Sequence, residues 1–211
     1  TDLNSLERAP NIIVIGPDSL VNSELCGLLT ASLGGSQIIS GAEVCPVSFS
    51  DLEGYAEKLS REISKRDSKR VTLVGVGCGA AVAVLLAIEL PHIIRRIAFL
   101  SPQFRKPPTG LRLFVDSLED ALPLGLPFTG NRDVLDVRSM LHRVRVPSLL
   151  CICADCGWET LARDVEKAAK VCPGIIVQQV EALKSAQVIS LIEELQSRDI
   201  KCSQKNIKKA S

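Results

Sequence analysis

The sequence has few aromatic residues, almost no net charge and only two histidines. Aromatic side chains make up 3% of the 211 residues, which argues against a surface that stacks single-stranded nucleic acid on rings interleaved with basic residues. Lys and Arg number 25 against 24 Asp and Glu, giving a formal charge of +1. This balance gives no general reason to expect DNA, RNA or an anionic membrane as a partner. We therefore predict no nucleic-acid partner.

Long hydrophobic runs are also absent. No apolar stretch approaches the roughly 18 to 20 residues that span a bilayer, so we expect no transmembrane segment. The sequence opens without a secretory signal pattern, which favours an intracellular, reducing compartment, either the cytoplasm or an organelle interior. Eight cysteines in a chain of this length do not make a small disulfide scaffold. Five of them lie in apolar contexts typical of buried free thiols: Cys26, Cys78, Cys151, Cys153 and Cys172.

Short β-branched apolar runs alternate with helical patterns along the chain, and 46% of the residues are hydrophobic. Strands that are apolar throughout and alternate with helices predict a mostly parallel sheet with helices on both faces. We expect strands near residues 11–15, 38–39, 71–74, 97–100, 148–153 and 175–180. We expect helices up to residue 33 and over residues 51–66, 80–90, 160–171 and 186–196.

The length suits one α/β domain with polar ends. We assign residues 1–10 to an N-terminal arm, residues 11–198 to the domain, and residues 199–211 to a basic flexible tail. Residues 101–144 hold five of the eleven prolines and only short apolar clusters. This segment is interpreted as a lid insertion of short helices between two sheet strands.

The stretch RVTLVGVGCG, residues 70–79, is the most informative part of the chain. Residues 71–74 predict a buried parallel strand, and the apolar residues 80–90 predict a helix directly after it. Between them, GVGCG (75–79) fits the frame G-x-S-x-G, in which a sharp strand-to-helix turn lifts a nucleophilic serine above a sheet. Gly77 stands at the serine position. The pattern therefore predicts a nucleophile elbow that lacks its nucleophile.

Several segments around this turn resemble, in order, the α/β-hydrolase family, and the match runs from about Asn11 to Gln196. Residues 11–16 are similar to the strand that ends in the family's His-Gly oxyanion motif. LPHIIRRIAFLSP (90–102) resembles the link after the elbow helix, and DVRSMLHRVRVPSLLCICADC (136–156) resembles the lid exit and the strand that presents the catalytic acid. The resemblance implies an α/β-hydrolase-like fold with a short lid and reduced N-terminal strands.

The resemblance also implies positions for a catalytic triad of nucleophile, histidine and acid. The nucleophile position holds Gly77, so the degenerate elbow consists of Gly75, Gly77, Cys78 and Gly79. The acid would fall in the turn after the strand 148–153, where Asp155 and Cys156 compete for the position. The histidine normally lies in the loop after the last strand, here residues 181–185, which contain none.

The remaining histidines offer no replacement base. His92 precedes a strand on the link from the elbow helix, and His142 lies between charged residues at the lid exit; both are interpreted as surface residues. The oxyanion segment reads Ile15-Gly16, without the family's histidine, although backbone N–H donors of such a hole could survive.

Loss of both serine and histidine favours a non-catalytic protein, because removing one triad member already costs several powers of ten in rate. We expect a structural or protein-interaction subunit of a larger complex, with other protein subunits as partners. No catalytic residue, cofactor or metal is expected. If an acid remains, it is Asp155.

An alternative is a cysteine-dependent hydrolase or acyltransferase that uses Cys78. Cysteine is intrinsically nucleophilic, and the elbow lies at a helix N-terminus, where the helix dipole stabilises a thiolate. A shift of one residue from the nucleophile position should point Cys78 away from the usual oxyanion hole. A buried thiol packed beneath the helix is the competing interpretation.

A second alternative is a small apolar ligand bound between elbow and lid. The glycine elbow leaves space there, and the lid carries apolar side chains: Leu111, Leu113, Phe114, Val115, Leu118, Leu122, Leu124, Leu126 and Phe128. The same residues could pack on the sheet or against another protein.

Two further alternatives rest on spacing. Cys151, Cys153 and Cys156 could form a metal or redox cluster, but structural zinc usually needs a second pair of ligands, which this sequence lacks at a suitable spacing. Gly75, Gly77 and Gly79 follow a strand as in dinucleotide-binding turns. However, Ala80 stands at the third-glycine position, and the strand is the third rather than the first.

Overall fold

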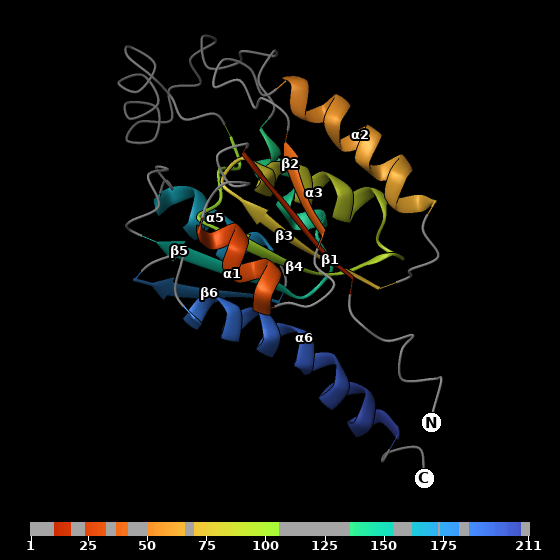
Figure 1. Ribbon diagram of the computed structural model, residues 1–211, viewed down its shortest axis with the longest axis vertical. Helices are drawn as coiled ribbons and strands as arrows, with labels where there is room; N and C mark the ends of the chain where they lie inside the picture. The colour runs from red at the N-terminus through yellow and green to blue at the C-terminus, as the bar shows by residue number, and fades with distance from the viewer. Residues whose placement is uncertain are drawn as a thin grey trace.

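The computed structural model describes residues 11–17, 24–32, 37–41, 50–65, 70–105, 136–153, 162–172, 174–181 and 186–207. These form a six-stranded sheet in the order β2-β1-β3-β4-β5-β6, with every neighbouring pair parallel. In Figure 1 the arrowheads of the strands point toward the left of the view, so their amino ends lie on the right. The predicted parallel α/β architecture is confirmed.

The strands are β1 (Asn11–Pro17), β2 (Gln37–Gly41), β3 (Val71–Val76), β4 (Ile94–Leu100), β5 (Ser148–Cys153) and β6 (Ile175–Val180). The α-helices are α1 (Glu24–Ser32), α2 (Ser50–Ser64), α3 (Gly79–Glu89), α5 (Ala162–Val171) and α6 (Ala186–Ile207), and a 3-10 helix, η4, spans Val137–Arg143. Each predicted strand is present, and β1 and β2 extend beyond their apolar runs. Within the described ranges, no helix combines the length and apolar character that crossing a bilayer requires.

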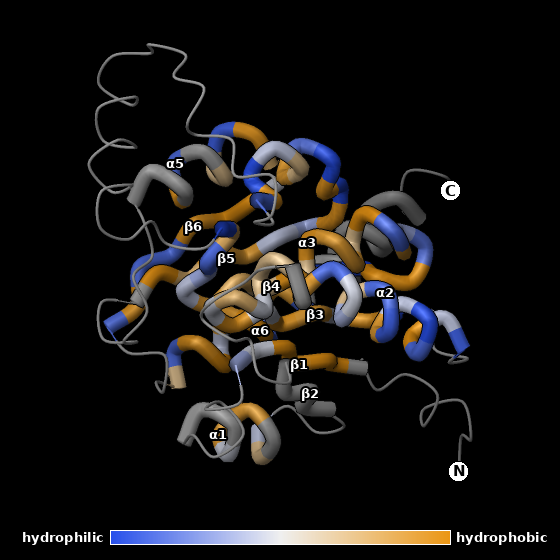
Figure 2. The backbone as a smooth tube through the Cα atoms, turned by 90° about the horizontal axis from the view of Figure 1, so that it is seen from above, coloured by the Kyte–Doolittle hydropathy of each residue, from blue (hydrophilic) through white to orange (hydrophobic). Residues whose placement is uncertain are grey.

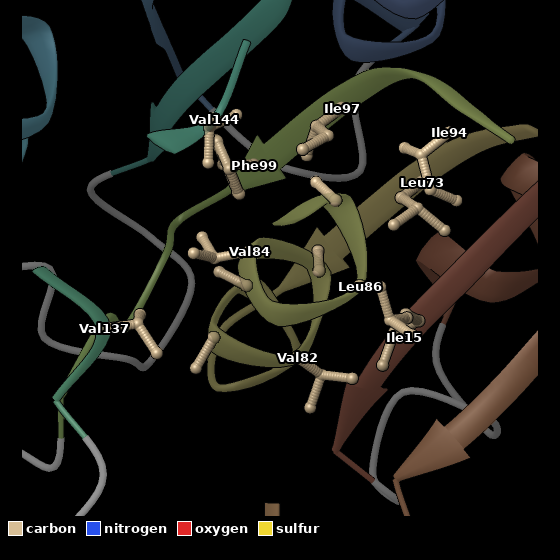
Figure 3. Close-up of a cluster of buried hydrophobic side chains, with 14 of the residues drawn as sticks. Ile15, Leu73, Val82, Val84, Leu86, Ile94, Ile97, Phe99, Val137 and Val144 are labelled. Atoms are coloured by element: carbon tan, nitrogen blue, oxygen red, sulfur yellow. The ribbon is translucent and has the colours of Figure 1, made fainter. Parts of the chain in front are cut away.

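Helices cover both faces of the sheet. One face packs against α2, α3, η4 and α5, and its core includes Leu73, Ile97 and Phe99 from the strands. Figure 3 shows these side chains on the side of the sheet that α3 covers, in one buried cluster with Val82, Val84 and Leu86 of that helix. The other face packs against Leu29 of α1 and a row of α6 side chains, Val188, Ile189, Ile192 and Leu195. Because both faces are buried, the central strands are apolar at most positions rather than alternating, and the polar exceptions in β3 and β4 are Thr72, Arg95 and Arg96.

The tube view of Figure 2 shows the apolar strands between helices whose outer turns are hydrophilic. Helix α3 differs from the rest, because eight of its eleven residues are buried. Its all-round apolar sequence follows from its place over the centre of the sheet, between α2 and η4.

The C-terminal helix is longer than the sequence pattern predicts. We expected it to end near Gln196, where the apolar spacing stops at Leu195, but α6 continues to Ile207. Residues assigned to the basic tail are therefore helical up to Ile207. The extension contains neither Pro nor Gly, and Gln, Arg and Lys are good helix formers, so propensity carries the helix beyond its buried face.

The insertion between β4 and β5 begins and ends at one place. Arg105 and Asp136 form an isolated antiparallel bridge, and the backbone N–H of Val137 donates to the carbonyl of Phe104 at 3.1 Å. The predicted lid residues between Arg105 and Asp136 lie outside the described part of the chain. The sequence predicts short helices in the insertion, and η4 is a short helix at its C-terminal end.

Candidate functional site

The elbow lies where the order of the strands reverses. Chain order runs outward in opposite directions from β1 and β3, which are neighbours in the sheet. In open parallel sheets, ligands bind outside the carboxyl ends of the strands at such a switch point. The turn after β3 and the end of β1 at Pro17 therefore frame the candidate site, as the sequence motif predicts.

Gly77 has the backbone geometry of a sharp elbow. Its φ is 55°, in the left-handed region that side-chain-bearing residues rarely adopt. Its N–H donates to the carbonyl of Leu100 at 3.1 Å, and its own carbonyl accepts from Ala80 at 3.1 Å and from Gln103 at 2.9 Å. The turn is thus tied both to the start of α3 and to the segment after β4.

The two flanking glycines allow the helix to pack closely on the sheet. A Cβ at Gly75 would lie 2.7 Å from the Cα of Ala80, and a Cβ at Gly79 would collide with the backbone carbonyl of Ile15. A backbone cannot yield as a flexible side chain can. Gly75 and Gly79 are therefore packing glycines, and they set α3 directly against β1 and β3.

Cys78 forms the N-cap of α3, with φ −65° and ψ −21°, but is turned into the core. Its side chain is 7% exposed and belongs to the cluster between the sheet and α3. Burial raises the pKa of the Cys78 thiol, and the backbone N–H groups of Cys78 and Gly79 offset only part of this rise. The thiol is therefore protonated at neutral pH, which is the arrangement of a packed side chain.

Both histidines of the chain lie at the edge of the sheet opposite the elbow. His92 is exposed in the turn before β4, and His142 is exposed in the last turn of η4, ahead of β5. The elbow, by contrast, follows the carboxyl end of β3. The fold therefore brings no histidine of this chain to Gly77 or Cys78.

The end of β1 offers no backbone N–H at Pro17, and the loop that follows lies outside the described residues. The family's oxyanion hole takes one N–H from the residue after the nucleophile and one from the loop after the strand corresponding to β1. In this chain β1 ends at Pro17, directly after Ile15-Gly16, and proline has no N–H. The other donor would be the backbone N–H of Cys78, the residue after Gly77.

Ser101 is a feature of this edge that our sequence reasoning did not single out. It lies one residue beyond β4, is fully buried, and has φ 43°. Its N–H donates to the carbonyl of Cys151 at 2.8 Å, which extends the ladder between β4 and β5. Left-handed residues of this kind gather at functional sites, but no local pattern marks Ser101 as one, because a residue before proline ordinarily adopts an extended conformation.

The remaining predicted site residues fall outside the described ranges or stay apart. Asp155 and Cys156 lie in residues 154–161, which the structure does not describe. Cys151 is buried in β5, where burial raises its pKa to about 12, and Cys172 is buried at the end of α5. Among the described residues, no three His, Cys, Asp or Glu side chains gather as a metal site.

The strand order also differs from that of the dinucleotide fold. Nucleotide-binding domains of that type have the order 3-2-1-4-5-6, with the glycine-rich turn after the first strand. Here the turn follows the third strand in a sheet ordered β2-β1-β3-β4-β5-β6.

Comparison with known proteins yields structural similarity without sequence similarity. No family model matches the chain, and no curated protein matches it in sequence. Among solved structures, it is similar to MGS-MChE2, an alpha/beta hydrolase enzyme from the metagenome of lagoon sediments at Mar Chica, Morocco. The TM-score is 0.61 at 14% identity, over 91% of this chain and 93% of that one.

Two further similar structures belong to proteins named for other activities. Naproxen esterase from Bacillus subtilis matches with a TM-score of 0.62 at 13% identity, over 92% of this chain and 84% of the esterase. The thioesterase domain from the curacin biosynthetic pathway matches with a TM-score of 0.57 at 12% identity, over 89% and 91%. At identities this low, the structural similarity supports a shared fold but not a shared activity. The chain therefore has the α/β-hydrolase fold.

Proposed function

We propose that this chain is a non-catalytic protein of the α/β-hydrolase fold that serves as a structural or protein-interaction subunit of a larger assembly. The observation that carries the proposal is the φ of 55° at Gly77, the residue at the serine position of the G-x-S-x-G frame, which has no side chain to attack with. The placement of His92 and His142 at the opposite edge supports it, because acyl transfer needs a base beside the nucleophile.

The packing around the elbow supports the same proposal. Gly75 and Gly79 hold α3 against the sheet, so the turn is part of the core of the fold. A glycine turn that the packing requires can be present in a protein that catalyses no reaction. A fold with this arrangement is free to present its outer surfaces to partners.

Isolation of the protein from its source under native conditions tests the proposal. Mass spectrometry would record the co-purifying proteins and any thiol or hydroxyl labelled by a broad acyl or electrophilic probe. We expect stoichiometric partner subunits and no labelled residue at the elbow. A chain recovered alone and labelled at one site, with hydrolysis of a p-nitrophenyl ester that follows the label, contradicts the proposal.

Catalysis by Cys78 is the second candidate, favoured by its place at the N-terminus of α3 and by the similarity of the fold to an alpha/beta hydrolase enzyme and to naproxen esterase. Its burial and raised pKa oppose it. Cys78→Ala decides between the two. Loss of both probe labelling and esterase activity in this variant establishes a cysteine hydrolase, whereas an unchanged background rate excludes Cys78 as its source.

Binding of a small apolar ligand remains a prediction, since the lid side chains on which it rests lie outside the described residues. Native mass spectrometry of the same preparation tests it. A small molecule that stays bound to the chain in the native spectrum and is released on denaturation would support this alternative.

A further inference from the structure

The edge of the sheet opposite the elbow gathers exposed basic side chains from within or next to several separate elements. Parallel strands connected by helices place the starts of the strands and the ends of the preceding helices at one edge. Six exposed cations occupy these positions and are here called the amino-edge cluster: Lys65, Arg70, Arg95, Arg143, Arg145 and Lys170.

Backbone contacts fix this placement. Arg70 directly precedes β3, whose first residue, Val71, donates its N–H to the carbonyl of Ile93 at 3.0 Å, next to the start of β4. Ile97 of β4 in turn donates to the carbonyl of Pro147 at 3.2 Å. Arg70, Arg95 and Arg145 therefore stand at the starts of three adjacent strands, which lie about 4.8 Å from one another.

Helix ends widen the cluster on the side of α2 and α5. Lys65 follows the last residue of α2, and Lys170 lies in the last turn of α5. Cys172, two residues after Lys170, has its Sγ 4.0 Å from the carbonyl oxygen of Val144, between Arg143 and Arg145. In Figure 1 the end of α2 and the starts of β3 and β4 lie on the same right-hand side.

The cluster is not neutralised from within the described chain. None of the six cations forms an ion pair with a described carboxylate, whereas Arg61 on α2 pairs with Glu57 and Arg138 pairs with Asp136. Like charges on adjacent strands repel, and a partner surface of opposite sign would relieve this repulsion beyond what water and salt screen. The net charge of +1 conceals this local excess.

We propose that the amino-edge cluster is a docking surface for a carboxylate-rich protein surface. This inference rests on the proposed function and names the face that the partner covers. Four of the six cations are arginines, whose planar guanidinium matches a carboxylate with two parallel hydrogen bonds.

Two features distinguish an acidic protein from a nucleic acid as the occupant. The exposed carboxylates Glu62 and Glu89 lie at the ends of α2 and α3, on this same edge. A phosphate backbone is negative throughout and would be repelled by both, whereas a protein surface can place a lysine opposite each. No aromatic side chain stands among the six cations to stack a base.

Fluorescence anisotropy with two labelled probes tests the proposal on the purified chain. The probes are a poly-L-glutamate peptide and a short mixed-sequence RNA duplex, each titrated at low and at physiological salt. We expect the peptide to bind more tightly than the duplex, and Arg95→Glu/Arg145→Glu to weaken peptide binding about tenfold. Lys58→Glu, on the outer face of α2, is the matched control for single Arg145→Glu because each changes the net charge equally.

Each possible result of these titrations either supports or overturns the proposal. Peptide binding that falls with Arg145→Glu and not with Lys58→Glu supports the proposal. Tighter binding of the duplex overturns it in favour of a nucleic-acid partner. Absence of peptide binding at low salt, or an equal loss in both single variants, also overturns it.

Carbodiimide coupling, which joins an amine to a carboxylate with no spacer, locates the face in the native assembly. We expect Lys65 and Lys170 to couple to the partner's carboxylates and Lys58 not to. Coupling of Lys58 alone, with partners present, overturns the docking surface and leaves the proposed function standing. A chain isolated without partners contradicts the proposed function, while the peptide titration still decides whether this edge recognises carboxylates.

Discussion

Gly79 lies so close to Ile15 that a side chain at Gly79 would overlap the backbone carbonyl of Ile15. This contact joins the first turn of α3 to β1, the strand that pairs with β3 where the strand order reverses. The spacing of the two segments is thus set by the absence of a side chain. Gly75 and Gly79 are therefore required by the packing of α3 on the sheet.

Gly79→Ala should destabilise the fold by about 3 kcal/mol or more, because a backbone carbonyl must move to admit the methyl group. Gly54→Ala is the matched control. A Cβ at Gly54 meets nothing within 4 Å on the exposed side of α2, so alanine there should stabilise by about 0.5–1 kcal/mol. Urea denaturation of both variants checks the pair, and equal effects of the two substitutions would contradict the packing role of Gly79.

Gly77→Ser restores the side chain of an elbow nucleophile but should not restore catalysis. No histidine lies near it to take its proton, and its φ of 55° makes any side chain strained by about 1–2 kcal/mol. The measurement is hydrolysis of p-nitrophenyl acetate together with the midpoint of urea unfolding. A serine-dependent rate well above that of the wild-type protein would show that a base does reach the elbow.

Asp136→Ala should cost about 1 kcal/mol, because the carboxylate caps η4 and pairs with Arg138. Its Oδ1 accepts from the backbone N–H of Arg138 at 3.0 Å and from Nε at 2.9 Å. Burial by itself would raise the pKa of Asp136, but hydrogen bonds and charge from Arg138, with a further contribution from Arg105, lower it below its ordinary value.

The sign of the pH dependence follows from that lowered pKa. The stabilisation is complete above the ordinary carboxyl pKa, about 4, and is lost as the pH falls through the lower folded value. The free-energy difference between wild type and Asp136→Ala should therefore be constant near neutral pH and shrink in acid. A difference that stays constant down to pH 2 would exclude the carboxylate charge as its source.

Alkaline pH should destabilise the protein through Cys151. Burial raises the pKa of this thiol from 9.0 to about 12, so the folded state keeps a proton that the unfolded state releases. The stabilisation is fully present below pH 9 and is lost as the pH rises toward 12, with a slope of up to about 1.4 kcal/mol per pH unit.

Comparison with Cys151→Ala isolates this effect from lysine and tyrosine titration. The variant should be less stable at pH 8 by about 1 kcal/mol, because a buried sulfur is removed. Its unfolding free energy should then decline less steeply between pH 9 and 11. Parallel declines of the two proteins would show that Cys151 ionises equally in the folded and unfolded states.

Local sequence patterns predict most of the architecture. The β-branched runs predict all six strands, and the alternation with helices predicts a parallel sheet, because apolar strands must be covered on both faces. The GVGCG frame predicts the elbow after β3, and the φ of 55° at Gly77 confirms a turn that only glycine adopts readily. The end of α6 was missed, since apolar spacing stops at Leu195 while helix propensity continues.

Long-range placement was decided only by tertiary structure. Composition and spacing do not say that Ser101 is buried beside the elbow or that both histidines lie at the far edge, whereas the burial of Cys78 agrees with its apolar context in the sequence. Nor does a net charge of +1 indicate that cations preceding three different strands meet on one side. These relationships depend on which strands are neighbours and on their direction. The sequence by itself therefore determined the elements and their periodicity, whereas the folded sheet decided which distant side chains share an edge.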